Sequence, residues 1–356
     1  MSEAITVQAP GKLYIAGEYA VVESGQPAVL IAVDRFMTVK LAPAENYGLV
    51  RSHGAAFDTV YWRHENGTPV FDDFGQDYAA NAIRIIEKLR EERGLPARHY
   101  TIDITSGLVE KDGRKYGLGS SAAVTVAIVD ALGKFYGLEL SDLERFKLAL
   151  IAVLERAPRA SGGDVAASTY GGWLFYTSPD RAGIVEKATR GTVEETLACA
   201  AWDSCRIEKL PAPAQETLQV GWTRSPASTE HLVSGVQARS KGSYFPGFLE
   251  KSAARVAGIV AALRSASPIG PFVSQARELL RKLGDTSGIC IETPLLTALC
   301  DIAEKHGAYA KSSGAGGGDC GIALVPAEIG AKIADIHQEW QEAGVFPLPL
   351  RVWQKQ

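Results

Sequence analysis

The sequence has few of the residues that mark metal-binding, secreted or membrane-bound proteins. Its 356 residues include only five cysteines and six histidines, and no two cysteines form a Cys-x-x-Cys pair. Zinc sites and disulfide scaffolds are therefore not indicated, and we expect reduced thiols. No hydrophobic run approaches the roughly 18 residues of a membrane span, and the first residues lack a basic and an apolar signal region. These absences predict a cytoplasmic protein.

An excess of positive charge is also missing. The formal net charge is −4, so the chain has no general attraction for nucleic acid or for an anionic membrane. Any phosphate binding must come from a local site, and we expect a small-molecule substrate and a monomer or homodimer. The length predicts about two domains. We place them at residues 1–205 and 206–356, because prolines and charges accumulate near the boundary.

The most informative stretch is Gly117-Leu-Gly-Ser-Ser-Ala122, which leads into an apolar segment that predicts a helix over Ser120–Tyr136. Glycines let the backbone approach a ligand closely, and the unpaired N–H groups and positive dipole end of a helix attract an anion by about 0.3–1 kcal/mol. The stretch therefore predicts a phosphate cradle. The structural alternative is a tight loop before a core helix. The P-loop pattern of nucleoside triphosphatases is absent, and the dinucleotide-binding fingerprint is matched only in the wrong context.

Hydrophobic periodicity predicts the remaining elements. In the first half we expect strands over 5–9, 12–15, 28–33, 36–41 and 100–105, a turn at Pro10-Gly11, and helices over 76–93 and from the capping box Ser141–Glu144 to about 156. Residues 178–213 show no regular pattern. In the second half we expect strands over 217–223, 308–311, 322–325 and 348–353, and helices over 228–240, 247–265, 268–283, 328–342 and after Thr293-Pro294.

Three segments, in this order, resemble the motifs of the GHMP small-molecule kinases: Ala9–Tyr19, Gly117–Ala123 and Ser313–Gly321. Within that superfamily, the Gly17–Glu23 run, Trp222–Thr229 and Asp319 in the last motif are most similar to bacterial-type phosphomevalonate kinases. A mevalonate kinase would more often show Pro-x-Gly-x before the glycine-serine loop, where this chain has Gly113–Tyr116. The resemblance covers nearly the whole chain.

The resemblance implies an α+β fold with an N-terminal nucleotide-binding α/β domain, a C-terminal ferredoxin-like α/β domain and an active site between them. It implies phosphorylation of 5-phosphomevalonate with ATP and Mg²⁺ as cofactors, with Lys12 and Asp164 as catalytic residues and the hydroxyl of Ser121 (or Ser120) on the metal. ATP phosphates would lie on Lys115, Gly117, Leu118, Gly119, Ser120, Ser121 and Ala122. The acceptor would contact Tyr19, Ser225, Ser228, Ser313, Gly314, Ala315 and Gly316.

The role of Asp164 depends on the acceptor. A hydroxyl acceptor needs a general base, whereas a phosphate monoester, whose second pKa is about 6, is already largely a dianion at neutral pH. With 5-phosphomevalonate, Asp164 would orient Lys12, magnesium or substrate; its structural alternative is an N-cap of a helix over 165–170. Two polyanions must then be brought together against about 4 kcal/mol per pair of charges 4 Å apart. The candidate cations are Lys12, Lys115, Lys311, Arg224 and Arg114.

Several other functions stay open. Mevalonate kinase, or another kinase of this superfamily that phosphorylates a hydroxyl, is the first alternative, and a large loss of activity on Asp164→Asn would favour it. A diphosphomevalonate decarboxylase would release carbon dioxide. An inactive ligand-binding sensor would form no ADP, and a dehydrogenase would change the absorbance of a nicotinamide cofactor. Glu155 is expected to be a surface residue of its helix, and Cys320 a buried structural thiol.

Overall fold

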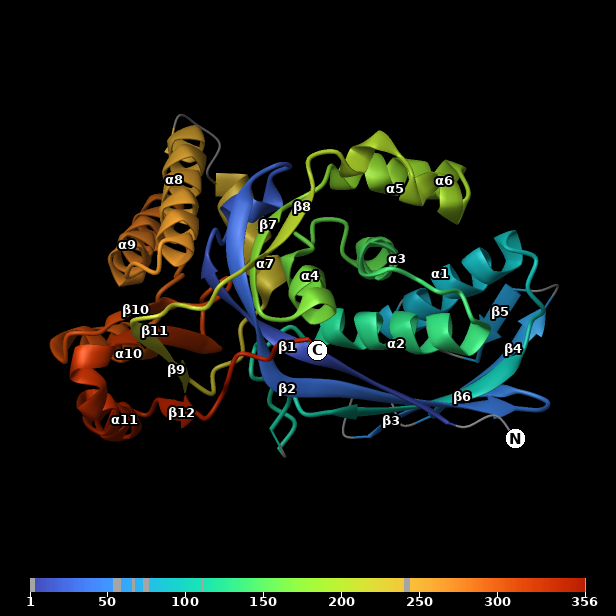
Figure 1. Ribbon diagram of the computed structural model, residues 1–356, viewed down its shortest axis with the longest axis horizontal. Coiled ribbons are helices and arrows are strands. Elements are labelled where there is room, and N and C mark those ends of the chain that lie inside the picture. Colours follow the sequence, from blue (N-terminus) through green and yellow to red (C-terminus); the bar gives the residue numbers. More distant parts are fainter. Residues whose placement is uncertain are drawn as a thin grey trace.

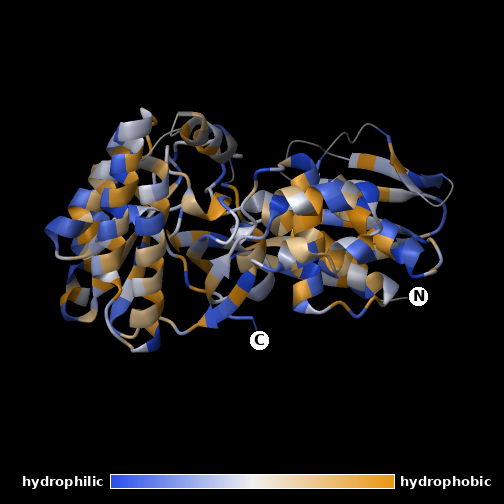
Figure 2. Ribbon diagram, turned by 90° about the horizontal axis from the view of Figure 1, so that it is seen from above, coloured by the Kyte–Doolittle hydropathy of each residue, from blue (hydrophilic) through white to orange (hydrophobic). Residues whose placement is uncertain are grey.

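The computed structural model describes residues 4–53, 59–65, 68–72, 77–110, 112–239 and 244–355. Two halves lie side by side, the first built on a large mixed sheet and the second on a small antiparallel sheet (Figure 1). Figure 2 shows the same two halves from above, with hydrophobic segments inside both of them. The architecture confirms the predicted α+β class.

The first sheet orders its strands β5-β4-β3-β6-β2-β7-β8, and β1 pairs with β2. The long strand β2 is paired with β1 along most of its length, with β7 through its first part and with β6 through its second part. Only β3 and β6 run parallel among the described pairs. The strands are β1 (Ile5–Ala16), β2 (Pro27–Ala44), β3 (Gly48–His53), β4 (Thr59–Glu65), β5 (Thr68–Phe71), β6 (His99–Ser106), β7 (Trp173–Thr177) and β8 (Arg206–Leu210).

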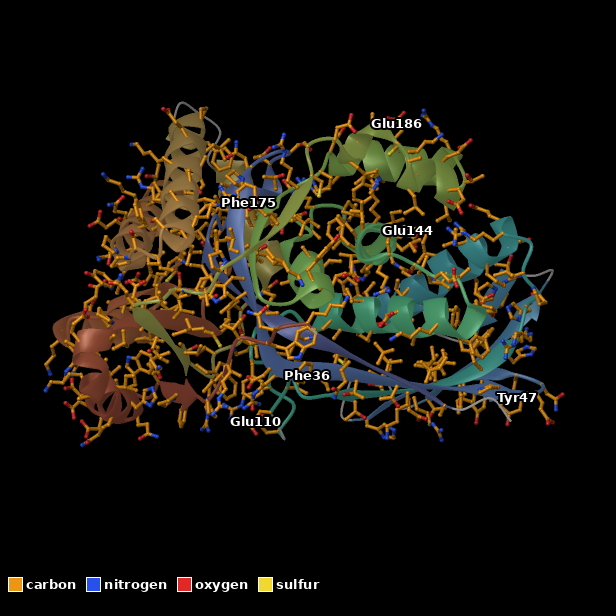
Figure 3. All side chains as sticks on the ribbon, viewed as in Figure 1. Phe36, Tyr47, Glu110, Glu144, Phe175 and Glu186 are labelled. Carbon is orange, nitrogen blue, oxygen red and sulfur yellow. The ribbon has the colours of Figure 1, made fainter. Side chains whose placement is uncertain are left out.

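Helices gather on one face of this sheet (Figure 1). They are α1 (Tyr78–Glu92), α2 (Ser120–Tyr136), α3 (Asp142–Arg156), α4 (Gly163–Tyr170), α5 (Arg181–Arg190) and α6 (Val193–Leu197), with short 3₁₀ turns η1 (Ala20–Val22) and η2 (Ala200–Trp202). The predicted bounds of α2 are confirmed. The capping box of α3 is confirmed as well, because the Glu144 N–H donates to Ser141 Oγ at 3.2 Å and the Ser141 N–H donates to Glu144 Oε2 at 2.8 Å (Glu144 is labelled in Figure 3).

The second half has the strand order β10-β11-β9-β12, all antiparallel. With helices between β9 and β10 and between β11 and β12, this order is that of the predicted ferredoxin-like fold. Its strands are β9 (Glu216–Trp222), β10 (Tyr309–Ser312), β11 (Cys320–Pro326) and β12 (Phe346–Leu348). Its helices are α7 (Thr229–Arg239), α8 (Tyr244–Arg264), α9 (Gly270–Ser287), α10 (Pro294–Lys305) and α11 (Ile333–Glu342), with the 3₁₀ turn η3 (Ala327–Lys332).

Some local predictions are wrong. Pro10-Gly11 does not turn the chain: β1 runs through it, and the irregularity is a shift of register against β2 between these two residues. The strand predicted over 348–353 ends at Leu348, and the helix predicted from Glu328 begins as η3 before α11. The irregular stretch 178–213 contains α5, α6 and β8. The capping box Thr192-x-x-Glu195 in this stretch is a helix signal that the periodicity did not supply.

The segment after β12 returns to the first half. The Trp353 N–H donates to Ala32 O at 2.9 Å, the Gly172 N–H donates to Trp353 O at 2.7 Å, and the Ala32 N–H donates to Gly172 O at 2.9 Å. Farther along, Lys355 Nζ donates to Asp142 Oδ1 at 2.5 Å. The strand β8 also belongs to the first sheet although it follows Cys205, so a division into domains at that residue remains a prediction.

None of the helices in the described part of the chain combines the length and the hydropathy that crossing a membrane requires.

Candidate active site

The predicted phosphate loop lies at the N-terminus of α2. Gly117 and Gly119 have φ of +79° and +80°, which glycine adopts without strain, and Gly119 is the N-cap of the helix. No side chain caps this helix end. Ser120 and Ser121 are half-buried, and Ala122 is buried. The loop therefore presents backbone N–H groups and two hydroxyls at the positive end of a helix, an arrangement that suits a phosphate.

Lys12 reaches this loop from β1. Its N–H donates to Leu118 O at 2.9 Å, and its Nζ donates to Gly117 O at 3.2 Å. Lys12 is only 9% exposed, so it is buried and not a solvated lysine at the end of a strand. A Cβ on Gly119 would lie 3.1 Å from Lys12 Cε and 3.5 Å from Asp164 Cβ. Gly119, Lys12 and Asp164 thus meet at one point, as the resemblance implied, and the positive φ of Gly119 would be strained for a residue with a Cβ.

Asp164 lies in the first turn of α4. The N-cap of this helix is Gly162 at φ +84°, so the interpretation of Asp164 as the N-cap is wrong. Its Oδ1 accepts a hydrogen bond from the Val165 N–H at 3.1 Å. Ser168 Oγ, on the same helix, donates to Pro10 O at 2.7 Å and ties α4 to β1 close to Lys12.

Tyr14 stands between α4 and the second half. Its hydroxyl is 3.0 Å from Ser161 Oγ. Burial raises the pKa of Tyr14 far above its usual value, and the negative charge of Asp164 raises it further. Tyr14 is therefore a neutral phenol at any physiological pH and can donate a hydrogen bond.

Three contacts join the first motif to β10 and to the glycine-rich loop that follows it. Ser313 Oγ accepts from the Tyr14 N–H at 2.9 Å and donates to Tyr14 O at 3.0 Å. The Tyr19 hydroxyl donates to Ala315 O at 2.5 Å. Lys311 Nζ forms an ion pair with Glu18 and donates to Ser312 O at 2.5 Å. Hence Tyr19, Ser313 and Ala315, all predicted acceptor contacts, come together at the seam between the halves.

The Glu18–Lys311 ion pair was not foreseen. The side chains are 3% and 0% exposed, so Lys311 is enclosed with its counter-ion. It is therefore not the cation that neutralises an acceptor phosphate. No local sequence signal indicates this pairing, because the two residues are 293 positions apart.

The other predicted contacts are less closely grouped. A Cβ on Gly316 would lie 2.9 Å from the carbonyl carbon of Ile291, whereas a Cβ on Gly314 would meet no atom within 4 Å. The Ser225 carbonyl accepts a hydrogen bond from the Asp319 N–H at 2.8 Å, and the side chain of Ser225 is exposed. Ser228 is exposed before α7 and accepts the His231 N–H at 3.4 Å. Lys115 is exposed at the entrance of the phosphate loop. Their roles as ligand contacts stay predictions.

Two of the candidate cations stack on one indole ring. Arg114 Cζ lies 5.5 Å and Arg224 Cζ 5.6 Å from the Trp222 ring centroid, and Arg114 also pairs with Asp112 at 2.5 Å. Tyr116, from the phosphate loop, packs 4.7 Å from Trp222 between ring centroids and donates to Glu110 Oε2 at 2.7 Å. Figure 3 shows Glu110 at the edge of the first half, on the side of β9 and β12.

Asp319 also lies at this site, although the sequence indicated it only as part of the resemblance of the last motif. Its Cγ and Oδ2 would lie 2.5 and 2.6 Å from a Cβ on Gly117, so the carboxylate rests against the phosphate loop. Burial raises the pKa of Asp319, while the Ala227 N–H and the positive charges of Lys12 and Lys115 act in the opposite direction. A charged residue in a glycine-rich loop is the signal that could have singled it out.

Two predictions about other residues are confirmed. Cys320 is 1% exposed, and burial raises the pKa of its thiol well above the usual range. Glu155 is exposed near the end of α3; its partial burial raises its pKa, and the positive charges of Lys88 and Arg84 on α1 act in the opposite direction.

Residue types at the site fit a magnesium ion held partly by substrate. Among residues 4–53, 59–65, 68–72, 77–110, 112–239 and 244–355, no group of three or more His, Cys, Asp or Glu side chains could hold a metal. In phosphoryl-transfer enzymes Mg²⁺ is bound by one or two protein oxygens and by the phosphates themselves. The Ser121 hydroxyl in the first turn of α2 and the Asp164 carboxylate beside Gly119 are oxygen donors of this kind.

Comparison with known proteins gives consistent results. Residues 80–172 match the GHMP kinases N terminal domain, and residues 253–343 match the GHMP kinases C terminal family. The chain is 46% identical over 362 residues to a phosphomevalonate kinase of Streptomyces sp. (strain CL190), covering 97% of this chain and 96% of that protein. It is 26% identical to a mevalonate kinase of Thermococcus sibiricus, covering 98% and 96%.

A solved structure shares the same architecture. The phosphomevalonate kinase of Streptococcus pneumoniae, in complex with phosphomevalonate and AMPPNP, superposes with a TM-score of 0.86 at 29% identity, covering 99% of this chain and 100% of that one. The motifs, the two halves of the fold and these matches agree along the whole chain. The chain therefore belongs to the GHMP kinase family.

Proposed function

We propose that the protein is an ATP-dependent phosphomevalonate kinase. It transfers the γ-phosphoryl group of ATP to the phosphate of 5-phosphomevalonate and yields 5-diphosphomevalonate and ADP. The bond between the γ-phosphorus and the β,γ-bridging oxygen breaks, and a bond forms between that phosphorus and an acceptor phosphate oxygen. The observation that carries this proposal is the 46% identity to a phosphomevalonate kinase over 97% of the chain. The meeting of Lys12, Asp164 and the phosphate loop supports it.

The loop at the start of α2 is proposed to bind the ATP phosphates through its backbone N–H groups. Lys12, buried against Gly117 and Gly119, stabilises the charge of the transferred phosphoryl group. Phosphoryl transfer depends on positioned charge more than on covalent catalysis. Bound Mg²⁺ supplies further positive charge to the nucleotide phosphates, and Ser121 and Asp164 are its proposed protein ligands.

The acceptor phosphate does not need a base to become a nucleophile, since it is largely a dianion at neutral pH. Asp164 is therefore assigned an orienting role toward Lys12, the metal and substrate. Lys311 is enclosed with Glu18, so the cations left for the second anion are Lys12, the exposed Lys115, and Arg114 and Arg224 beside Trp222. Tyr19, Ser313 and Ala315, which already meet across the seam, are the proposed acceptor contacts.

ADP release tests the proposal. The purified protein is given ATP and Mg²⁺ with (R)-mevalonate, 5-phosphomevalonate, 5-diphosphomevalonate, homoserine or galactose, each alone. Turnover with 5-phosphomevalonate only is expected. Turnover with an unphosphorylated alcohol would overturn the assignment and restore Asp164 as a general base. No ADP with any acceptor would favour a ligand-binding sensor, and carbon dioxide release would favour a decarboxylase.

Two variants at the site and one control sharpen the test. Lys12→Met should lower kcat roughly 100- to 1,000-fold, the cost of removing one preorganised charge contact. Lys40→Met, a change of an exposed strand lysine in β2, is the matched control and should leave kcat unchanged. Asp164→Asn should lower kcat only mildly with 5-phosphomevalonate.

We also infer that the protein works in the cytoplasm with reduced thiols; all five cysteines are free in the described structure. Whether it is a monomer or a homodimer stays a prediction that light scattering can test.

A further inference from the structure

Asp319 adopts a backbone conformation that favours glycine. Its φ is +53°, and the positive-φ residues just before it in the loop are all glycines, namely Gly314, Gly316, Gly317 and Gly318. A residue with a Cβ is strained in this region, although aspartate and asparagine tolerate it better than others. Glycine would satisfy the backbone more easily. The aspartate side chain therefore needs a reason of its own.

The backbone contacts of Asp319 do not supply that reason. Its N–H donates to Ser225 O at 2.8 Å, and its carbonyl accepts from the Thr223 N–H at 2.9 Å and from Thr223 Oγ1 at 3.0 Å. Any residue other than proline could make these three bonds. The side chain itself accepts only one long bond among the described ones, from the Ala227 N–H to Oδ1 at 3.3 Å.

The other side of the carboxylate faces the first half of the molecule. Cγ and Oδ2 lie against Gly117, whose carbonyl accepts from Lys12 Nζ at 3.2 Å. In the described part of the chain neither Lys12 nor Asp319 has an oppositely charged side chain within 4.0 Å. The charges acting on the carboxylate are those of Lys12 and Lys115. A buried ammonium without a contact counter-ion thus lies close to a carboxylate from the opposite half.

We propose that Asp319 is a positioning residue for Lys12: its carboxylate, carried by the second half, holds the ammonium at the phosphate loop where the transferred phosphoryl group passes. This inference rests on the proposed kinase function. It explains why a carboxylate lies beside a loop that binds polyanions, where it repels the ground-state nucleotide. The same charge keeps Lys12 in place, and the positioned Lys12 acts on the transition state.

The proposal predicts that loss of the carboxylate lowers kcat but does not lower the affinity for the nucleotide. Asp319→Asn keeps the shape and the tolerance of positive φ and removes only the charge. We expect kcat to fall about 10- to 100-fold, the range that small misplacements of catalytic groups cause. The KM for ATP should not rise and the calorimetric affinity for AMPPNP should not fall, because the variant lacks one negative charge near the nucleotide phosphates. Asp319→Gly should lower kcat to the same extent without lowering the midpoint of thermal unfolding.

Glu139 provides the matched control. It has φ +49° and is exposed after α2, far from the loop in sequence and outside the site. Glu139→Gly should relieve the backbone strain at this position and Glu139→Asn should keep it. Neither variant should change kcat.

Two results would overturn the proposal: a wild-type kcat in Asp319→Asn, with or without a raised KM, or weaker AMPPNP binding. The ratio of variant to wild-type kcat is measured with whichever acceptor the wild type uses. A wild type that rejects 5-phosphomevalonate but phosphorylates an alcohol would overturn the proposed function and still allow this ratio to be tested.

Discussion

Replacing Lys311 by methionine would leave the Glu18 carboxylate buried at the seam without its counter-ion. Both side chains are almost fully enclosed, and removal of one partner of such a pair costs about 3–5 kcal/mol. A typical protein is stable by only about 5–15 kcal/mol. Lys311→Met should therefore remove about a fifth or more of the free energy of unfolding, which corresponds to roughly a 150- to 4,000-fold change in the unfolding constant.

The double variant Glu18→Gln/Lys311→Met should be more stable than Lys311→Met alone, since no unpaired charge is then buried. Urea unfolding followed by circular dichroism and tryptophan fluorescence measures all of these changes. Because Glu18 belongs to the first half and Lys311 to the second, we expect Lys311→Met to unfold at the seam first. The two probes should then give different midpoints.

The exposed ion pair between Arg190 and Glu186 on α5 is the control, with side chains 77% and 64% exposed. Arg190→Met should leave the urea midpoint unchanged, because exposed pairs contribute little. The reasoning is refuted if Lys311→Met unfolds at the wild-type midpoint, or if the double variant is no more stable than Lys311→Met.

Three further results are expected. The exposed thiol of Cys290 should react first with Ellman's reagent, whereas buried Cys320, whose pKa burial raises, should react only after unfolding; early modification of Cys320 would contradict its burial. Burial lowers the pKa of His337, so the neutral form is favoured in the folded state. The stability it contributes is complete above the ordinary pKa of about 6.5 and is lost as pH falls below that value; His337→Gln should flatten the loss measured in urea between pH 7 and 5.5. Gly119→Ala places a methyl group 3.1 Å from Lys12 Cε at positive φ, and kcat/KM should fall at least tenfold while the far-ultraviolet spectrum is unchanged.

The sequence predicts well what short-range chemistry decides. The bounds of α2 follow from an apolar segment between the glycine-serine loop and Gly137, and the start of α3 follows from one capping box. The predicted phosphate loop follows from a motif of fewer than a dozen residues. Its meeting with Lys12 and the fold class were implied by the resemblance of the three motifs, in their order, to those of the GHMP kinases.

The sequence does not predict what distant residues decide together. β1 continues through Pro10-Gly11 because β2 pairs with it on both sides of a register shift, and tertiary pairing outweighs the local turn signal. Lys311 looks like an available cation until Glu18 is placed against it from 293 positions away. Asp319 lies against Gly117 only because the second half packs on the first, and no local sequence pattern indicates that contact.

The return of Trp353 to the first half has a consequence for how the chain acquires its structure during synthesis. Trp353 pairs with Ala32 and Gly172, directly after the helix that carries Asp164. At about 5–20 residues per second, a ribosome needs on the order of 10–40 s to travel from Gly172 to Trp353. During that interval the nascent first half has an unfinished edge next to α4. Chaperones and proteases would therefore meet this edge before the enzyme becomes competent.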